Sequence, residues 1–199
     1  MVAPDWGQLL LGLFLGVAGF VILALYTRVN ASTRRKGSGA HWRLGFVVGG
    51  LGMVIMGAGW AALCLAGPFL EESALSLLGL LLCIAALVVY VISARWVGRW
   101  RAPSAYSLEL QTQGIYRNVR HPQALALCIL SMGLGLFTGS IPYLFTVPLW
   151  IALWTAYTYL EENNELLPAF GDKYVRYRER TPRLFPRFFG RRKKLKRFR

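Results

Sequence analysis

The chain has 199 residues, of which 55% are hydrophobic and only 16% charged, and its mean hydropathy is +0.43. This composition indicates an integral membrane protein and excludes a disordered chain, a secreted disulfide scaffold and a coiled coil. A formal net charge of +14 would also suit nucleic acid, but the basic residues are distributed as in a membrane protein. Cys64, Cys83 and Cys128 lie inside apolar runs without metal-ligand spacing, so we interpret them as small buried hydrophobic residues and expect no metal.

Five apolar runs are long enough, or nearly so, for a helix that crosses a hydrocarbon layer of about 30 Å. They cover about Trp6 to Tyr26, Leu44 to Gly67, Leu75 to Val97, Ala124 to Phe137 and Ile141 to Leu160. The fourth run is short and rich in glycine, so we expect it either to tilt or to pair closely with the fifth as a hairpin through Thr138, Gly139 and Ser140. The expected fold class is an all-α integral membrane protein with about five transmembrane helices.

The basic residues set the predicted orientation of the chain. Five of them lie between the first and second runs, five between the third and fourth, and the other 13 after the fifth. The loops on the opposite side carry only Asp5, Glu71 and Glu72. Because Lys and Arg in short loops stay on the cytoplasmic side, we expect the N-terminus outside and the C-terminus in the cytoplasm.

The last 13 residues, RFFGRRKKLKRFR at 187–199, carry eight basic side chains interleaved with aromatic and aliphatic ones. This pattern favours contact with anionic phospholipid head groups, and the alternative is a solubilising tail that fixes orientation. We expect one membrane domain, in which residues 1–97 form three N-terminal spans, residues 98–186 form a helical hairpin with polar flanks, and residues 187–199 form the basic tail.

Three polar segments lie at the predicted cytoplasmic face. They are GIYRNVRHP at 114–122, the acidic residues Glu161, Glu162 and Glu165, and FGDKY at 170–174 with the later Tyr177, Pro182, Phe185 and Pro186. Proline is tolerated in the first turn of a helix, so Pro122 places Arg120 and His121 at the start of the fourth helix, near its positive end.

An antiparallel hairpin of the fourth and fifth runs would bring Arg120 and His121 to the same membrane face as Glu161 and Glu162. Charged groups beside hydrocarbon are costly unless they pair with each other or with a ligand. The sequence therefore predicts a site at this face. The alternative is structural: an interfacial ion pair between Arg120 and Glu162 that ties the hairpin together.

The order and spacing of these motifs resemble the membrane-embedded methyltransferases, which include the isoprenylcysteine carboxyl methyltransferases and the phospholipid N-methyltransferases. The resemblance covers residues 98–186 and is carried by GIYRNVRHP, the hydrophobic hairpin, the paired glutamates, FGDKY and the final PRLFP at 182–186. It implies a methyltransferase with a cytoplasmic C-terminal cofactor-binding region. The implied methyl donor is S-adenosylmethionine, which becomes S-adenosylhomocysteine, and the implied acceptor is a lipid or a small hydrophobic molecule.

The resemblance also implies which residues would contact the cofactor. They are Leu108, Glu109, Leu110, Gln111, Tyr116, His121, Pro122, Gln123, Ala124 and Glu162, with the segment 108–111 falling on a strand that precedes the motif. The chemistry agrees, because a carboxylate suits an ammonium group and ribose hydroxyls, and an aromatic ring suits adenine or a sulfonium.

Methyl transfer needs alignment and exclusion of water rather than a nucleophilic triad or a metal. Arg120 is the candidate to orient a carboxylate acceptor, whereas an amine acceptor needs a base, for which Glu161 and Glu165 are candidates.

Three positions depart from the family pattern. Leu108 stands where many relatives have histidine, Ala124 where a tyrosine is common, and Thr158 where the carboxyl methyltransferases often have arginine. The departure at Thr158 counts against an isoprenylcysteine acceptor, and the one at Ala124 predicts a reshaped pocket.

The leading interpretation is an isoprenylcysteine carboxyl methyltransferase-like enzyme, with a phospholipid N-methyltransferase as the alternative. Two readings of another class are an NADPH-dependent membrane reductase of the sterol-reductase type and a membrane scaffold without enzymatic activity. The paired carboxylates favour a positively charged cofactor over one that carries a phosphate.

Overall fold

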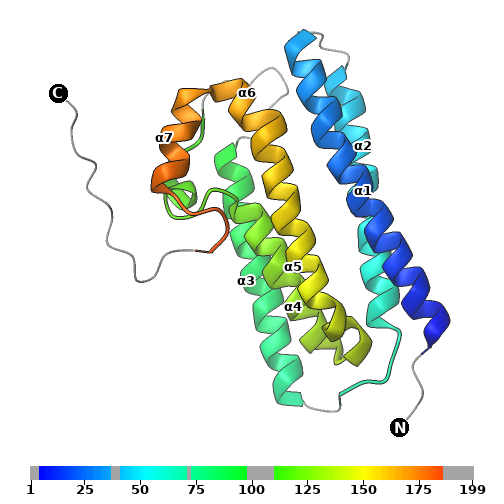
Figure 1. The fold of residues 1–199 in the computed structure, drawn as a ribbon. Helices are drawn as coiled ribbons and strands as arrows, with labels where there is room; N and C mark the ends of the chain where they lie inside the picture. The colour runs from blue at the N-terminus through cyan, green and yellow to red at the C-terminus, as the bar shows by residue number, and fades with distance from the viewer. Residues whose placement is uncertain (1–4, 37–40, 71–72, 98–109, 186–199) are drawn as a thin grey trace.

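The computed structural model describes residues 5–36, 41–70, 73–97 and 110–185, and over these residues the fold is all-helical (Figure 1). The long helices are α1 (Trp6–Lys36), α2 (His41–Cys64), α3 (Ser73–Val97), α4 (Pro122–Thr138) and α5 (Ile141–Glu161). The short ones are η2 (Gly114–Arg117), η3 (Glu162–Leu166), α6 (Leu167–Phe170) and α7 (Asp172–Arg180). The predicted all-α class is confirmed, and the basic tail at 187–199 lies outside the described residues.

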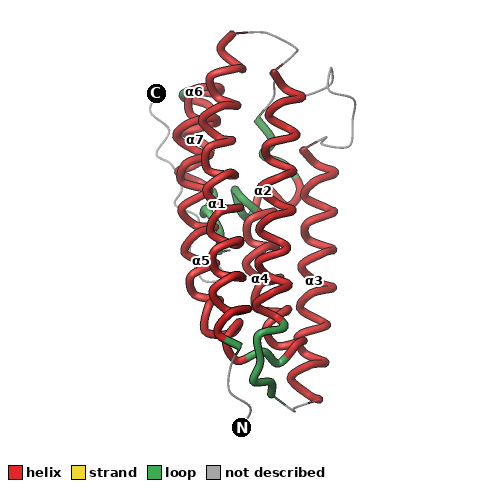
Figure 2. The backbone as a smooth tube through the Cα atoms, turned by 90° about the vertical axis from the view of Figure 1, so that its right-hand side faces the viewer, coloured by secondary structure: helices red, strands yellow, loops and turns green. Residues whose placement is uncertain are grey.

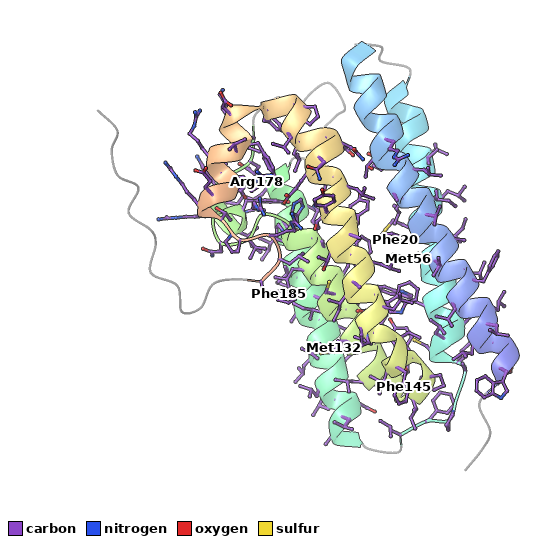
Figure 3. All side chains as sticks on the ribbon, in the orientation of Figure 1. Phe20, Met56, Met132, Phe145, Arg178 and Phe185 are labelled. Atoms are coloured by element: carbon purple, nitrogen blue, oxygen red, sulfur yellow. The ribbon has the colours of Figure 1, made fainter. Side chains whose placement is uncertain are left out.

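The long helices form two packed pairs, α1 with α2 and α3 with α4, and α5 packs against members of both pairs (Figures 1 and 2). Each pair is joined through glycines: Gly16 of α1 lies against Gly59 of α2, and Gly79 of α3 against Gly133 of α4. Small residues let two helix backbones approach closely, which is the usual basis of helix packing in lipid. Figure 3 shows Phe20 in the space between α1 and α5.

Three helices of the described chain are long and apolar enough to cross a membrane, over Trp6–Arg28, Val47–Cys64 and Ala74–Trp96. They fall on the first three predicted runs. Helix α4 is apolar but has only 17 residues, so the total of five spans remains a prediction. Helix α1 continues to Lys36, ten residues beyond the predicted end of the apolar run, because no glycine or proline lies between Tyr26 and Gly37.

The predicted hairpin between α4 and α5 is confirmed, and its turn is built from Gly139 and Ser140. Gly139 adopts a left-handed φ of 67° after the last residue of α4, a conformation that favours glycine. Ser140 Oγ accepts a hydrogen bond from the Tyr143 amide at 3.4 Å and donates one to the carbonyl of Leu63 at 2.9 Å. The turn therefore caps α5 and fixes the hairpin to the end of α2, and the other ends of α4 and α5 meet at the opposite end of the bundle.

The described segments that precede α4 and follow α5, residues 110–121 and 162–185, gather at that opposite end. The hydroxyl of Tyr177 in α7 donates a hydrogen bond to the carbonyl of Tyr116 at 2.6 Å. The side-chain amide of Gln111 donates one to the carbonyl of Trp96 at 2.8 Å. Asn164 donates to Thr27 of α1 at 3.3 Å. These hydrogen bonds hold η2, η3 and α7 over the ends of α1, α3, α4 and α5.

Candidate functional site

Five charged or ionisable side chains meet where α4 begins and α5 ends. His121 Nε2 lies 2.9 Å from Oε1 of Glu162, and its Nδ1 lies 3.2 Å from Oε2 of Glu161. Arg120 Nη2 lies 3.4 Å from Oε1 of Glu162, and Arg183 Nη2 lies 3.2 Å from Oε2. We call these five residues the polar cluster. It joins the two sequence segments that the hairpin was expected to bring together.

The backbone fixes the basic half of the cluster from two directions. His121 is the residue immediately before α4, and Pro122 occupies the first turn of that helix, where its missing amide hydrogen costs nothing. The amides of Arg120 and His121 donate to the carbonyls of Pro182 and Arg183 at 2.9 Å and 3.1 Å. The chain after α7 therefore returns to lie along the segment before α4.

The acidic half of the cluster lies at a change of helical geometry. Helix α5 ends at Glu161, and η3 continues it as a π-helical turn from Glu162 to Leu166. Such turns carry one residue more than an α-helical turn and occur frequently at functional sites. Glu162 and Glu165 are both buried on this turn, with 1% and 8% of their surface exposed.

The cluster stabilises its charged forms. Burial alone would raise the pKa of Glu162, but the hydrogen bond and charge of His121, with the guanidinium groups of Arg120 and Arg183, lower it to about 2. Burial alone would lower the pKa of His121, but its hydrogen bonds to Glu161 and Glu162 raise it above the ordinary value. Glu162 is thus held as an anion, and the two carboxylates favour the protonated form of His121.

Two of the hydrogen-bond donors of Arg120 have no partner among the described residues. Its side chain is 7% exposed, and Nη2 faces Glu162, while Nε and Nη1 are buried and have no hydrogen-bond partner among the described residues. A buried guanidinium with unsatisfied donors costs free energy unless an acceptor reaches it. An oxyanion, such as a carboxylate or a phosphate, is the group that matches these donors.

The structure places the predicted site residues in three groups, two of which lie where α4 begins and α5 ends. Arg120, His121, Glu161 and Glu162 are joined by the contacts given above, and Glu165 is buried on the same π-helical turn. Pro122, Gln123 and Ala124 form the first turn of α4, where Pro122 and Ala124 are buried and Gln123 is partly buried.

The residues nearer to α3 are arranged differently. Tyr116 is buried in η2, and its hydroxyl donates to the carbonyl of Ser93 at 3.4 Å, so its polar end points toward α3. Leu110 and Gln111 are half-buried in irregular backbone, where the resemblance implied a strand. The described residues contain no second strand to pair with this segment, and the Gln111 side chain instead hydrogen-bonds to the carbonyl of Trp96 in α3. Leu108 and Glu109 lie outside the described residues.

Arg183 is the member of the cluster that the sequence did not single out. Besides its contacts with Glu162, its guanidinium carbon lies 5.6 Å from the centre of the Tyr159 ring. Its side chain is 32% exposed, against 7% for Arg120. The available signal was its position within PRLFP, but nothing in that motif shows that the chain returns to α4.

Groups of three or more potential metal-ligating side chains are absent from the described part of the chain. The Phospholipid methyltransferase family model matches residues 74–173, which is half of the chain and runs from α3 into α7. No curated protein and no solved structure matches. The family match confirms the predicted resemblance to membrane-embedded methyltransferases.

Proposed function

The chain belongs to the phospholipid methyltransferase family, and we propose that this membrane methyltransferase transfers a methyl group from S-adenosylmethionine to the amine of a phospholipid head group. The observation that carries the proposal is the polar cluster, in which Arg120 keeps two buried donors without a partner while Glu161 remains partly exposed. An amine-bearing phospholipid head group has a phosphodiester that suits the arginine and an ammonium group that suits the carboxylate.

The cluster also fits the cofactor. S-Adenosylmethionine, when bound, supplies an electrophilic methyl group on a sulfonium. Its carboxylate matches one of the two spare donors of Arg120, which leaves the other donor for the phosphodiester of the lipid, and its ammonium and ribose hydroxyls match Glu162. Both oxygens of Glu162 already face basic side chains. We propose that Arg183 yields its place to the ligand, because it is the most exposed of the three basic partners.

The acceptor nitrogen must lose a proton before its lone pair can form the new bond to carbon. Glu161 is the candidate base, since its carboxylate is 28% exposed and contacts His121 Nδ1 at 3.2 Å. His121 orients this carboxylate, and Glu162 in turn orients His121. Glu165 remains the second candidate base. The orientation with this end of the bundle in the cytoplasm remains part of the proposal.

An amine acceptor is preferred over a carboxylate acceptor for two reasons. The matching family model is the phospholipid one. Thr158, which stands where the carboxyl methyltransferases often have arginine, is fully buried, and its hydroxyl donates to the Thr155 carbonyl at 2.8 Å. A carboxylate acceptor would therefore lack a cation at that position.

The test is a transfer assay with radiolabelled methyl donor and purified protein in nanodiscs. Phosphatidylethanolamine and N-acetyl-farnesylcysteine are offered in separate reactions. The proposal predicts label in the phospholipid, stable to mild base because it is bound to nitrogen. Label in the farnesylcysteine alone, released by base as an ester, would replace the proposal with carboxyl methylation.

A further inference from the structure

A second feature lies outside the polar cluster: an apolar groove between α2, α3 and α4. Its volume is about 460 Å³, within the range of roughly 300–1,000 Å³ that ligand sites occupy. Its lining includes Met53 of α2, Ala86 and Leu87 of α3, and Ala126 and Leu130 of α4. These side chains offer no charge, so the groove suits a hydrocarbon ligand.

The groove opens sideways along the bundle. Ile84 and Leu87, which both line it, are 51% and 62% exposed, whereas Ala86 and Ala126 beneath them are each 1% exposed. Helix α3 is also one of the helices that could span a membrane. The exposed rim of the groove therefore faces the hydrocarbon of the bilayer, and a lipid chain can enter without passing through water.

One end of the groove lies near the polar cluster. Ala126 follows Pro122 by one helical turn, which is about 6 Å along α4. On α3, Tyr90 lines the groove and stands three residues before Ser93, whose carbonyl accepts from Tyr116. The groove thus begins about one turn from the polar cluster, on the membrane side.

The other end lies deeper in the bundle. Cys83, which also lines the groove, precedes Tyr90 by seven residues, or about 10 Å of helix. One leaflet contributes about 15 Å of hydrocarbon, half of a layer of about 30 Å. A groove of this length covers the part of one acyl chain that is nearest to the head group.

We propose that this groove binds one acyl chain of the phospholipid acceptor, an inference that rests on the function proposed above. The family match includes α3 and α4, which supply most of the lining. Seating the chain there holds its head group within reach of Arg120 and Glu161, so that binding of the tail restricts the position of the reacting amine. The groove then determines which acyl-chain lengths the enzyme accepts, independently of the cofactor site.

Matched substitutions in α3 test this by activity. Ala86→Phe fills the groove, whereas Ala85→Phe makes the same change on the exposed side of the same helix. Ala86→Phe should lower kcat/KM for dioleoyl phosphatidylethanolamine at least about tenfold, with a much smaller effect on the dihexanoyl lipid. If Ala86→Phe does not fold, Leu87→Trp replaces it, because this substitution blocks the exposed rim of the groove. Val88→Trp is its control. Equal responses of both pairs would overturn the proposal.

A binding test does not require methyl transfer. Phosphatidylethanolamine with a photoactivatable acyl chain, in nanodiscs, should label the α3 and α4 peptides that line the groove, saturably and in competition with unlabelled dioleoyl lipid. Ala86→Phe should abolish the saturable labelling, and Ala85→Phe should not. Saturable labelling without methyl transfer would support the acyl-chain site and refute the proposed methyltransferase function. Unsaturable labelling, or competition by farnesylcysteine only, would refute the acyl-chain site.

Discussion

His121 and Glu162 are 41 positions apart in the chain, yet His121 Nε2 lies 2.9 Å from Glu162 Oε1 and both side chains are buried. The α4–α5 hairpin brings them together, and Arg120 and Arg183 complete the coordination of the same carboxylate. A carboxylate buried among three basic groups either stabilises the hairpin alone or also takes part in binding a ligand. The predictions below separate these two roles.

Glu162→Gln keeps the size of the side chain and removes its charge. Arg120 is then buried without a counter-charge, so the free energy of unfolding should fall by about 3–5 kcal/mol. The affinity for S-adenosylmethionine should fall at least about tenfold, equivalent to about 1.4 kcal/mol. Thermal unfolding and calorimetric titration at a temperature where the variant is folded measure the two effects. Glu161→Gln is the milder control, and unchanged affinity of the folded Glu162→Gln protein would leave a structural role only.

His121→Ala removes the group that contacts both glutamates, so cofactor binding should weaken by about tenfold or more through the loss of charged hydrogen bonds. The matched control is His41→Ala, which changes the first residue of α2. This control should bind as the unmodified protein does. Equal losses in the two variants, measured by the same titration, would mean that the segment before α4 is not part of the site.

Arg120 and Arg183 should differ although both contact Glu162. Arg120→Gln should weaken cofactor binding at least about tenfold, whereas Arg183→Gln should leave the affinity within about threefold of the original value. The reason is that Arg183 is the more exposed side chain and is proposed to yield its place to the ligand. Parallel titrations decide this, and an equally large loss in Arg183→Gln would show that Arg183 is needed in the bound state.

Stability should depend on pH through His121 and Glu162. The raised pKa of His121 contributes stability that is complete below its ordinary value of 6.5 and is lost as the pH rises through the folded-state pKa. The pKa of about 2 for Glu162 contributes stability that is present above its ordinary value of 4.5 and is lost as the pH falls toward 2.

The Tm in detergent should therefore be highest between about pH 4.5 and 6.5 and decline on both sides. Glu162→Gln should flatten the acidic decline and reduce the alkaline one, since it removes one titrating group and one partner of the other. A profile that Glu162→Gln leaves unchanged in shape would assign the pH dependence to other residues.

Much of the site could be predicted from local sequence, because its parts are close to helix ends. Pro122 marks the start of α4, and Gly139 with Ser140 marks the turn before α5. Once the hairpin is recognised, the meeting of His121 with Glu162 follows from geometry.

The contributions that the sequence did not reveal depend on tertiary contacts. Arg183 reaches Glu162 because the amides of Arg120 and His121 bind the returning chain, and no local pattern encodes that return. The apolar groove depends on the packing of α3 against α4 with Met53 of α2 beside them, whereas in sequence its lining is indistinguishable from any lipid-facing surface. The helical extension of α1 to Lys36 was missed because hydropathy marks where a span ends and not where its helix ends.

The most direct test of the central claim is calorimetric titration of the purified protein with S-adenosylmethionine, S-adenosylhomocysteine and NADPH in parallel. The account predicts micromolar binding of the first two, the affinity range of many enzyme ligands, and no binding of NADPH. It also predicts that Glu162→Gln weakens both interactions. Binding of NADPH alone, or of S-adenosylmethionine with equal affinity in the folded Glu162→Gln variant, would contradict the assignment of the polar cluster as the methyl donor site.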